Sequence, residues 1–451
     1  MMPTASLLVV ALLLQQGAPP DTAGGRPCRV AIDSMGHYHE ITDAAGLKTL
    51  HGGGGVLAHC DGTNSTISAD SFAHYTALGR LDLIGRVRIR DTGLALDANY
   101  ASYFLRDERL EAHNRVVAVN RRTGSVLRGP NLRYWRAAKG IRDTVEMYAT
   151  SRPTVEYRAE GGDSAEPYII VADRIRFKGD DRMWGGGKVT VDRSDFVSRS
   201  DSMLLDQIQG FGVLVGSPSV EGRGRPGTGA KGYRLVGTRI ELALEQREVR
   251  LVKALGHGKA TGADWVLTAD TIHLVVADRM LQQTFAWGDS TRPNAVSTLN
   301  TIQADSLAID SPGEVLTETR AFGHALSTAK RDSTSHAADT DWISGDTLTA
   351  HFAQEQDSAG HEQSRLRQVL ARGSARALTH NYNTRDSTAG PAINYSRGAQ
   401  IAVAMKRDRI ERVVVAGKAD GVNLEPRPAV AADSTRTATP PPVAPPPPPI
   451  P

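Results

Sequence analysis

Apolar and polar residues alternate with a period of two along most of the chain. In the segment 81–90, Leu83, Val87 and Ile89 interleave with three arginines, and Ile84-Gly85 interrupts the alternation, which indicates a bulge or bend. This period is typical of a strand with one buried face. Turn signals, such as Asp-Thr-Gly at 91–93, separate these segments, and no segment of similar length has a clean helical period. The pattern therefore predicts an essentially all-β chain.

A short motif recurs within the alternation. An apolar residue, a spacer, Ala-Asp (once Gly-Asp), a spacer and a second apolar residue begin a segment that usually closes on Gly-x-Val or Gly-x-Ala. Its aspartates are Asp70, Asp173, Asp270, Asp305 and Asp346. A recurrence of about 30 to 40 residues indicates stacked copies of one supersecondary unit. We therefore expect an elongated stack of antiparallel strands in two facing sheets, whose function belongs to an extended surface.

The two ends of the sequence differ from this pattern. An apolar run at 7–14, followed by small residues up to Ala18, predicts a secretory signal peptide over 1–18 and a periplasmic location. The run is too short to span a bilayer, and no second long apolar stretch follows it. No Lys or Arg precedes Leu7, so a short buried strand is the alternative. The proline-rich segment 427–451 predicts an extended or disordered tail.

Cysteine usage and charge narrow the function classes. Cys28 and Cys60 are the only two cysteines, and an isolated pair in an oxidising compartment favours a disulfide. The 53 basic and 50 acidic residues are intermixed along the chain. This balance gives no indication of nucleic-acid binding, and it is compatible with an acidic glycolipid as partner.

Two motifs that could carry chemistry lack the context that such chemistry needs. His37-x-His39 has no third metal ligand at a recognisable spacing. The pattern Gly222-x-Gly224-x-x-Gly227 matches the dinucleotide fingerprint but has no β-α-β context. We therefore expect no metal site and no cofactor.

The recurring aspartates are also poor candidates for catalysis. They occupy equivalent positions in successive repeats, whereas acid–base catalysis needs two carboxylates in different environments. We expect a structural role, in which each aspartate caps the start of a strand or orders a turn through hydrogen bonds to the backbone. The chain is not expected to be an enzyme.

The apolar strand faces leave two interpretations open. These residues either fill the space between two sheets about 10 Å apart or line a groove for acyl chains where the sheets splay. The candidate groove-lining residues are Ile67, Leu83, Val87, Ile89, Leu94, Leu96, Val117 and Val119. Composition does not choose between the two.

Several segments resemble a known family. Within about 52–139, these are Ile67-Ser68-Ala69-Asp70-Ser71-Phe72, Leu83–Ile89, Leu96–Tyr100 and Leu127–Tyr134. They closely resemble the OstA-like domain of the periplasmic lipopolysaccharide transport proteins of LptA type and of the N-terminal domain of the outer-membrane translocon. A second resemblance lies near the end, at Ala371–Ala375, Gly398–Ile401 and Val413–Ala419. We expect an N-terminal OstA-like domain at 28–158 and diverged OstA-like repeats at 168–425.

The resemblance implies a fold and a function. The fold would be an open β-jelly-roll (β-taco) whose apolar groove holds lipopolysaccharide acyl chains between the inner and outer membranes. Units of this family join end to end by strand pairing, and arginines such as Arg86, Arg88 and Arg90 would lie near lipid phosphates. This chain is much longer than one such unit, and it has large polar loops. The alternative is a structural or adhesive envelope protein with a closed core and no lipid transport.

Overall fold

The computed structural model describes most of the chain between Cys28 and Glu425. The described ranges are 28–61, 63–158, 166–223, 232–245, 248–262, 265–297, 300–329, 340–356, 362–381, 391–406 and 409–425. The expected signal peptide at 1–18 and the expected tail at 427–451 lie outside these residues.

The described residues form 30 antiparallel strands in one hydrogen-bonded sheet and two short 3-10 helices. The first ten strands are β1 (Val30–Ser34), β2 (His37–Thr42), β3 (Lys48–Cys60), β4 (Thr66–Tyr75), β5 (Arg80–Arg90), β6 (Leu94–Phe104), β7 (Arg109–Asn120), β8 (Val126–Trp135), β9 (Glu146–Thr150) and β10 (Thr154–Tyr157). The next ten are β11 (Tyr168–Val171), β12 (Arg174–Lys178), β13 (Arg182–Arg193), β14 (Phe196–Asp206), β15 (Phe211–Val215), β16 (Ser219–Gly222), β17 (Tyr233–Val236), β18 (Arg239–Glu245), β19 (Glu248–Thr261) and β20 (Trp265–Ala277). The last ten are β21 (Met280–Trp287), β22 (Asn294–Ser297), β23 (Asn300–Gln303), β24 (Ser306–Asp310), β25 (Glu318–Ala329), β26 (Trp342–Gln356), β27 (Glu362–Asn381), β28 (Ala392–Lys406), β29 (Arg409–Ala416) and β30 (Asp420–Leu424). The helices are η1 (Thr76–Leu78) and η2 (Pro312–Glu314).

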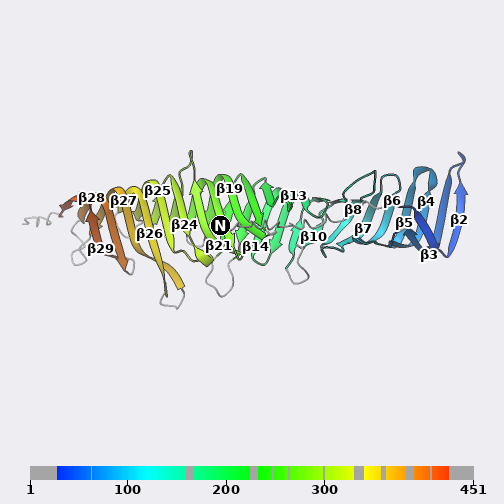
Figure 1. The fold of residues 1–451 in the computed structure, drawn as a ribbon, viewed down its shortest axis with the longest axis horizontal. Helices are drawn as coiled ribbons and strands as arrows, with labels where there is room; N and C mark the ends of the chain where they lie inside the picture. Colours follow the sequence, from blue (N-terminus) through cyan, green and yellow to red (C-terminus); the bar gives the residue numbers. More distant parts are fainter. Residues whose placement is uncertain are drawn as a thin grey trace, which may run out of the picture.

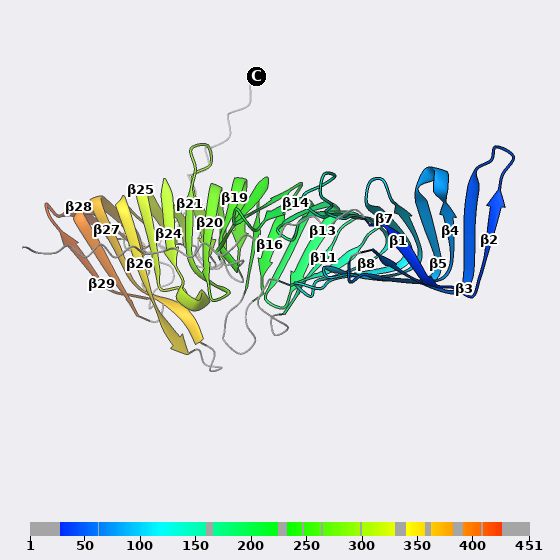
Figure 2. The ribbon, with the colours of Figure 1, turned by 45° about the vertical axis from the view of Figure 1, so that its right-hand side comes forward.

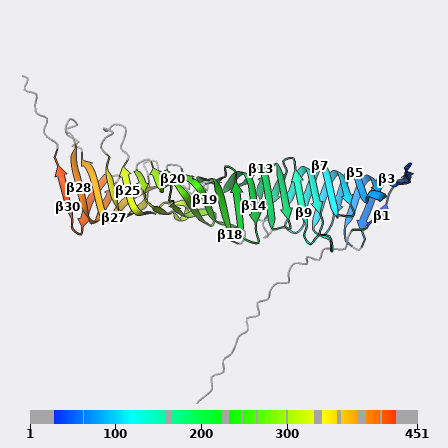
Figure 3. The same cartoon turned by 90° about the horizontal axis from the view of Figure 1, so that it is seen from above.

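The strands succeed one another along the long axis of an elongated molecule. Figure 1 shows this order, with β2 near one end and β28 and β29 near the other. The same succession is visible in the views turned by 45° and by 90° (Figures 2 and 3). The prediction of an all-β chain of stacked antiparallel strands is therefore confirmed.

The sheet is folded lengthwise into two layers. In β5, residues 80–84 pair with one half of β6 and residues 87–90 with the other half, and the register shifts between them. Elsewhere the chain itself divides at this point: β15 pairs with β18, whereas β16 pairs with β17. We call the layer that contains β15 and β18 the first layer, the layer that contains β16 and β17 the second layer, and the line where they meet the crease.

The recurring sequence motif forms the crease. Gly85 has a φ of 75° and Arg86 a φ of 44°, so the strand bends sharply at this pair. Opposite them lie Ala69, which is buried, and Asp70. A Cβ atom on Gly85 would lie 2.3 Å from Oδ2 of Asp70. Glycine is therefore required twice over at this position, by the left-handed backbone and by the close carboxylate.

The same arrangement repeats along the crease. A Cβ atom would lie 2.4 Å from Asp173 at Gly187, 2.2 Å from Asp305 at Gly323 and 2.1 Å from Asp346 at Gly373. The alanines of the motif turn into the interior: Ala172 and Ala304 are fully buried. Each Ala-Asp step thus supplies a small inward residue and an outward carboxylate at the bend.

The aspartates have two kinds of hydrogen-bond partner. Asp270 accepts hydrogen bonds from the backbone N–H groups of Ser290 (2.8 Å) and Thr291 (3.0 Å), and these bonds lower its pKa to about 2. Asp70 instead accepts a hydrogen bond from Nε of Arg86, at 2.8 Å. The expected bonding to a turn thus describes Asp270, whereas Asp70 bonds to the side chain of the bent strand.

Substitution of a crease glycine tests this geometry. Gly313 also has a positive φ, of 63°, but no atom lies within 4 Å of the site of its Cβ, so Gly313→Ala should cost only the backbone strain, about 1 to 2 kcal/mol. Gly323→Ala adds the clash with Asp305 and should cost at least about twice as much. Equilibrium denaturation followed by circular dichroism gives both values. Equal losses for the two variants, or no partial rescue of Gly323→Ala by Asp305→Ala, would contradict this account.

Candidate apolar interior

The inner faces of both layers form one apolar cluster along the stack. The cluster of buried residues begins at Cys28 and ends at Ile401. Its largest fully buried side chains are Leu83, Leu96, Leu132, Ile170, Ile175, Leu214, Leu235, Ile240, Leu267, Ile272, Leu274 and Leu307. Because these residues come from both layers, the interior is a single apolar space bounded by the crease on one side.

Five of the eight candidate groove-lining residues lie fully inside this cluster. They are Ile67, Leu83, Val87, Leu94 and Leu96. Leu96 is completely inaccessible to solvent. Ile89 is half-buried and packs against the same cluster. The alternation along β4, β5 and β6 therefore identified the inward face of these strands.

The remaining two candidates, Val117 and Val119, lie on the outer face. Val117 is in register with Asp97, and Val119 with Ala95, whereas the buried Leu96 is in register with Ala118. The inward positions of β7 belong to Val116 and Ala118. The strand bends at Asn114 and Arg115, with φ values of 61° and 54°, but the inward positions Leu110, Ala112, Val116 and Ala118 keep one alternation across the bend. Val117 and Val119 are therefore not interior residues.

The inward side chains of the two layers pack tightly against each other. Leu83 is 2% exposed and Val87 is 1% exposed, values of an ordinary core. Two small cavities lie among the interior residues of the N-terminal part, with volumes of about 50 and 40 Å³. An engineered apolar cavity that binds benzene measures about 150 Å³. In this conformation the interior has no space for an acyl chain at either cavity.

Within the described ranges, the main chain joins the two layers only at the crease. Turns at 91–93 and 121–125 lie at the free margin of the second layer, and the turn at 105–108 lies at the free margin of the first. Among the described residues, each strand pairing joins segments of the same layer. We call the line where the two free margins meet the seam. The layers could part at the seam without breaking a ladder hydrogen bond.

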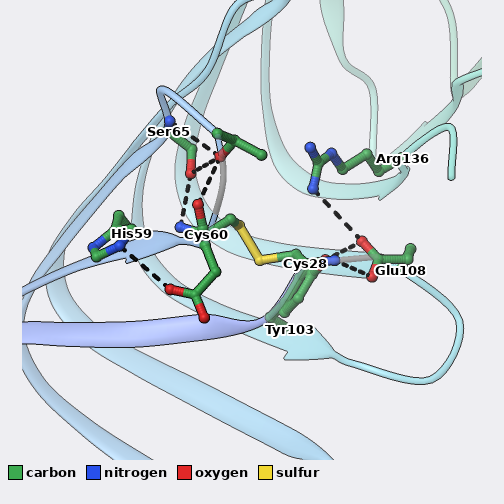
Figure 4. The surroundings of a disulfide bond; sticks show 9 residues. Cys28, His59, Cys60, Ser65, Tyr103, Glu108 and Arg136 are labelled. Carbon is green, nitrogen blue, oxygen red and sulfur yellow. Dashed lines mark hydrogen bonds and ion pairs between the residues drawn. A yellow bond between two sulfur atoms is a disulfide. The ribbon is translucent and has the colours of Figure 1, made fainter. Parts of the chain in front are cut away.

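A disulfide lies at the N-terminal end of the seam. Cys28 and Cys60 are bonded, with their Cα atoms 5.1 Å apart, and Val30 of β1 pairs with Cys60 at the end of β3 (Figure 4). The bond therefore fixes the first residues of the described chain to the second layer.

Both ends of the stack are unpaired strand edges. At the C-terminal end, β29 and β30 each pair only with β28 among the described residues. Val413, Val414, Val422 and Leu424 are between 43% and 56% exposed there. At the other end, every residue of β2 is exposed. Such edges can accept a further strand.

The three arginines predicted to lie near phosphates are on the outer surface. Arg86 forms an ion pair with Asp70 (2.7 Å) and Arg90 with Asp97 (2.6 Å). Arg88 is exposed. Neither ion pair faces the interior.

The histidine and glycine motifs considered in the sequence form no ligand site among the described residues. His39 stacks on His51 of the neighbouring strand, with ring centroids 5.2 Å apart. The described residues contain no group of three or more potential metal ligands. Gly222 ends β16, and Gly224 and Gly227 lie outside the described residues. Within the same ranges, no helix is long and apolar enough to cross a membrane.

Comparisons with known proteins give similarities to solved structures alone. No protein-family description matches the chain. No curated protein sequence matches it either. Among solved structures, the crystal structure of LptH, the LptA-homologous periplasmic component of the lipopolysaccharide transport device of Pseudomonas aeruginosa, is similar. The match covers 94% of that chain and 29% of this one, at 15% sequence identity and a TM-score of 0.25.

Proposed function

We propose that the protein is an elongated periplasmic carrier that binds the acyl chains of lipopolysaccharide or a related glycolipid in its apolar interior, during outer-membrane assembly. The observation that carries this proposal is the continuous apolar cluster between two layers that the backbone joins only at the crease. Burial of an acyl chain contributes about 0.8 kcal/mol per CH₂, so affinity needs no specific polar contact. A carrier of this kind needs no active site or cofactor.

The ends of the molecule suit a longer assembly. The exposed apolar residues of β29 and β30, and the exposed strand β2, would pair with edge strands of other OstA-like transport components. Such pairing would extend the apolar interior across the junction and join the inner and outer membranes. Exposed arginines such as Arg88 would then face lipid phosphates at the surface.

The closed interior favours a second candidate function. If the layers never part, the stack is a rigid strut in the cell envelope with a dry core, and its ends or loops make the contacts. This alternative requires a fully packed core, and Leu83 and Leu96 are 2% and 0% exposed.

Lipid retention separates the two functions. We expect the protein purified from a lipopolysaccharide-producing host to carry a glycolipid in native mass spectrometry. Ala118→Leu, which adds volume inside, should lower the retained lipid several-fold, whereas Val117→Leu on the outer face should not. Absence of bound glycolipid, even after incubation with lipopolysaccharide, would support the strut.

A further inference from the structure

Polar contacts fasten the seam at defined points. Glu108, in the turn at the margin of the first layer, is completely buried. Its carboxylate accepts a hydrogen bond of 2.6 Å from the backbone N–H of Cys28, at the margin of the second layer, and another from the hydroxyl of Tyr103 (Figure 4). Burial raises the pKa of Tyr103, so the phenol remains a neutral donor. We call Glu108 and these two partners the Glu108 clasp.

Two further contacts cross the seam in the same half of the molecule. Asp180, from the margin of the first layer, accepts hydrogen bonds from the side chains of Asn120 and Arg122, at the margin of the second. Farther along, the side chain of Gln207 donates to the hydroxyl of Tyr157. Polar side chains from the margins of both layers therefore hold the seam at these points.

The larger cavity lies directly beneath the Glu108 clasp. Its volume is about 50 Å³, and apolar side chains from both layers line most of it. The residues that line it include Ile67, Leu83, Leu94, Leu110, Tyr134 and Arg136. The wall of this largely apolar space also holds two charged side chains, Arg136 and Asp91, and the carboxylate of Asp91 accepts hydrogen bonds from the backbone N–H groups of Gly93 and Leu94.

Arg136 is incompletely satisfied. Its Nη1 atom is buried and makes no hydrogen bond among the described residues. The nearest carboxylate oxygen, Oε2 of Glu108, is 3.8 Å away and already accepts the hydrogen bond of Tyr103. A buried guanidinium N–H without an acceptor costs free energy that an anionic ligand would recover.

We infer that this cavity is a binding site for an amphiphile with an anionic head group, in which Arg136 holds the head group and the first part of the acyl chain occupies the apolar space. This inference rests on the proposed function, and it identifies the place where the lipid would enter the interior. A carboxylate or phosphate oxygen would accept from Nη1 of Arg136, since guanidinium binds both groups with good geometry. The chain would continue into the interior as the seam opens, because the closed cavity is too small for it.

A head-group comparison tests the inference. The probes are cis-parinaric acid, a fluorescent fatty acid, and its uncharged methyl ester. We expect the wild-type protein to bind the acid at least about tenfold more tightly than the ester, because the ester cannot accept the charge-assisted hydrogen bond from Arg136 as a carboxylate does. Arg136→Gln should abolish this preference while leaving the affinity for the ester unchanged, and Arg136→Lys should keep part of it.

A matched control lies three residues earlier in the sequence, in β8. Arg133 has a 56% exposed side chain and pairs with Glu111 at 3.3 Å on the outer surface. Arg133→Gln should retain the wild-type preference. Competition by lipid A with and without its phosphates then distinguishes a phosphorylated glycolipid from a free fatty acid as the natural ligand.

The outcomes separate the inference from the proposed function. A preference that persists in Arg136→Gln, or equal binding of acid and ester by the wild type, would overturn the head-group site alone. Failure of the wild type to bind either probe would overturn both this inference and the proposed carrier.

Discussion

Replacing Leu96 with alanine should destabilise the N-terminal part of the stack by about 3 to 4 kcal/mol. Leu96 is completely buried in β6, with Ile89 and Ala118 as its partners in register. Truncation removes Cγ and the two methyl groups of the leucine from a closely packed interior and leaves a cavity, and both effects destabilise. Because the neighbouring strands β5 and β7 hold the backbone on both sides, the cavity has little scope to collapse.

The outer face of the neighbouring strand provides the control. Val117→Ala removes a half-buried side chain in register with Asp97 and should cost less than about 1 kcal/mol. Stacked units can open locally, so hydrogen exchange of the β5, β6 and β7 amides gives the relevant free energies. Similar losses for the two variants would contradict the assignment of Leu96 to the interior and Val117 to the outside.

The sequence contained most of the information on the strands, because period-two alternation follows directly from the pleat. It assigned the inward face of β4, β5 and β6 correctly, at Ile67, Leu83 and Leu96. It failed in β7, where the run Val116-Val117-Ala118-Val119 is apolar on both faces. Valines occupy both faces there, so the alternation alone did not show that Val116 and Ala118 point inward.

The recurring motif and a bend at Gly85 could be predicted from the sequence, but the contact between the glycine and the aspartate could not. A glycine and an aspartate 15 residues apart, as at Asp70 and Gly85, contact each other only because the two strands pair across the bend. The crease is therefore a property of neighbouring strands together. Once the pairing is known, the motif explains why one sheet can close lengthwise on itself.

The seam could not be predicted from the sequence. Cys28 and Glu108 are 80 residues apart, and Asn120 and Asp180 are 60 residues apart. None of these residues belongs to a recurring pattern. Their contacts depend on how far each hairpin extends beyond the crease, which is set by the whole stack. Arg136 becomes a candidate binding residue only because the fold buries its Nη1 atom beside Glu108.

The closed interior changes what lipid binding would require. The resemblance to the OstA-like domain implied an open groove, whereas Val87 and Leu96 are sealed from solvent in this conformation. A carrier must therefore open along the seam, where the contacts of Glu108 and Asp180 hold the two margins. A strut would have no reason to open.

Site-specific photo-crosslinking in the periplasm tests the central claim most directly. A photoreactive residue at Leu96 or Val87 should capture a glycolipid on irradiation, because both positions face the interior. The same residue at Val117, on the outer face of the adjacent strand, should capture at least about tenfold less, since neighbouring positions of a strand point to opposite faces. Capture confined to the interior positions is the predicted result. No lipid captured at Leu96 and Val87 in correctly folded protein, or equal capture at Val117, would contradict the proposal that the interior carries lipid.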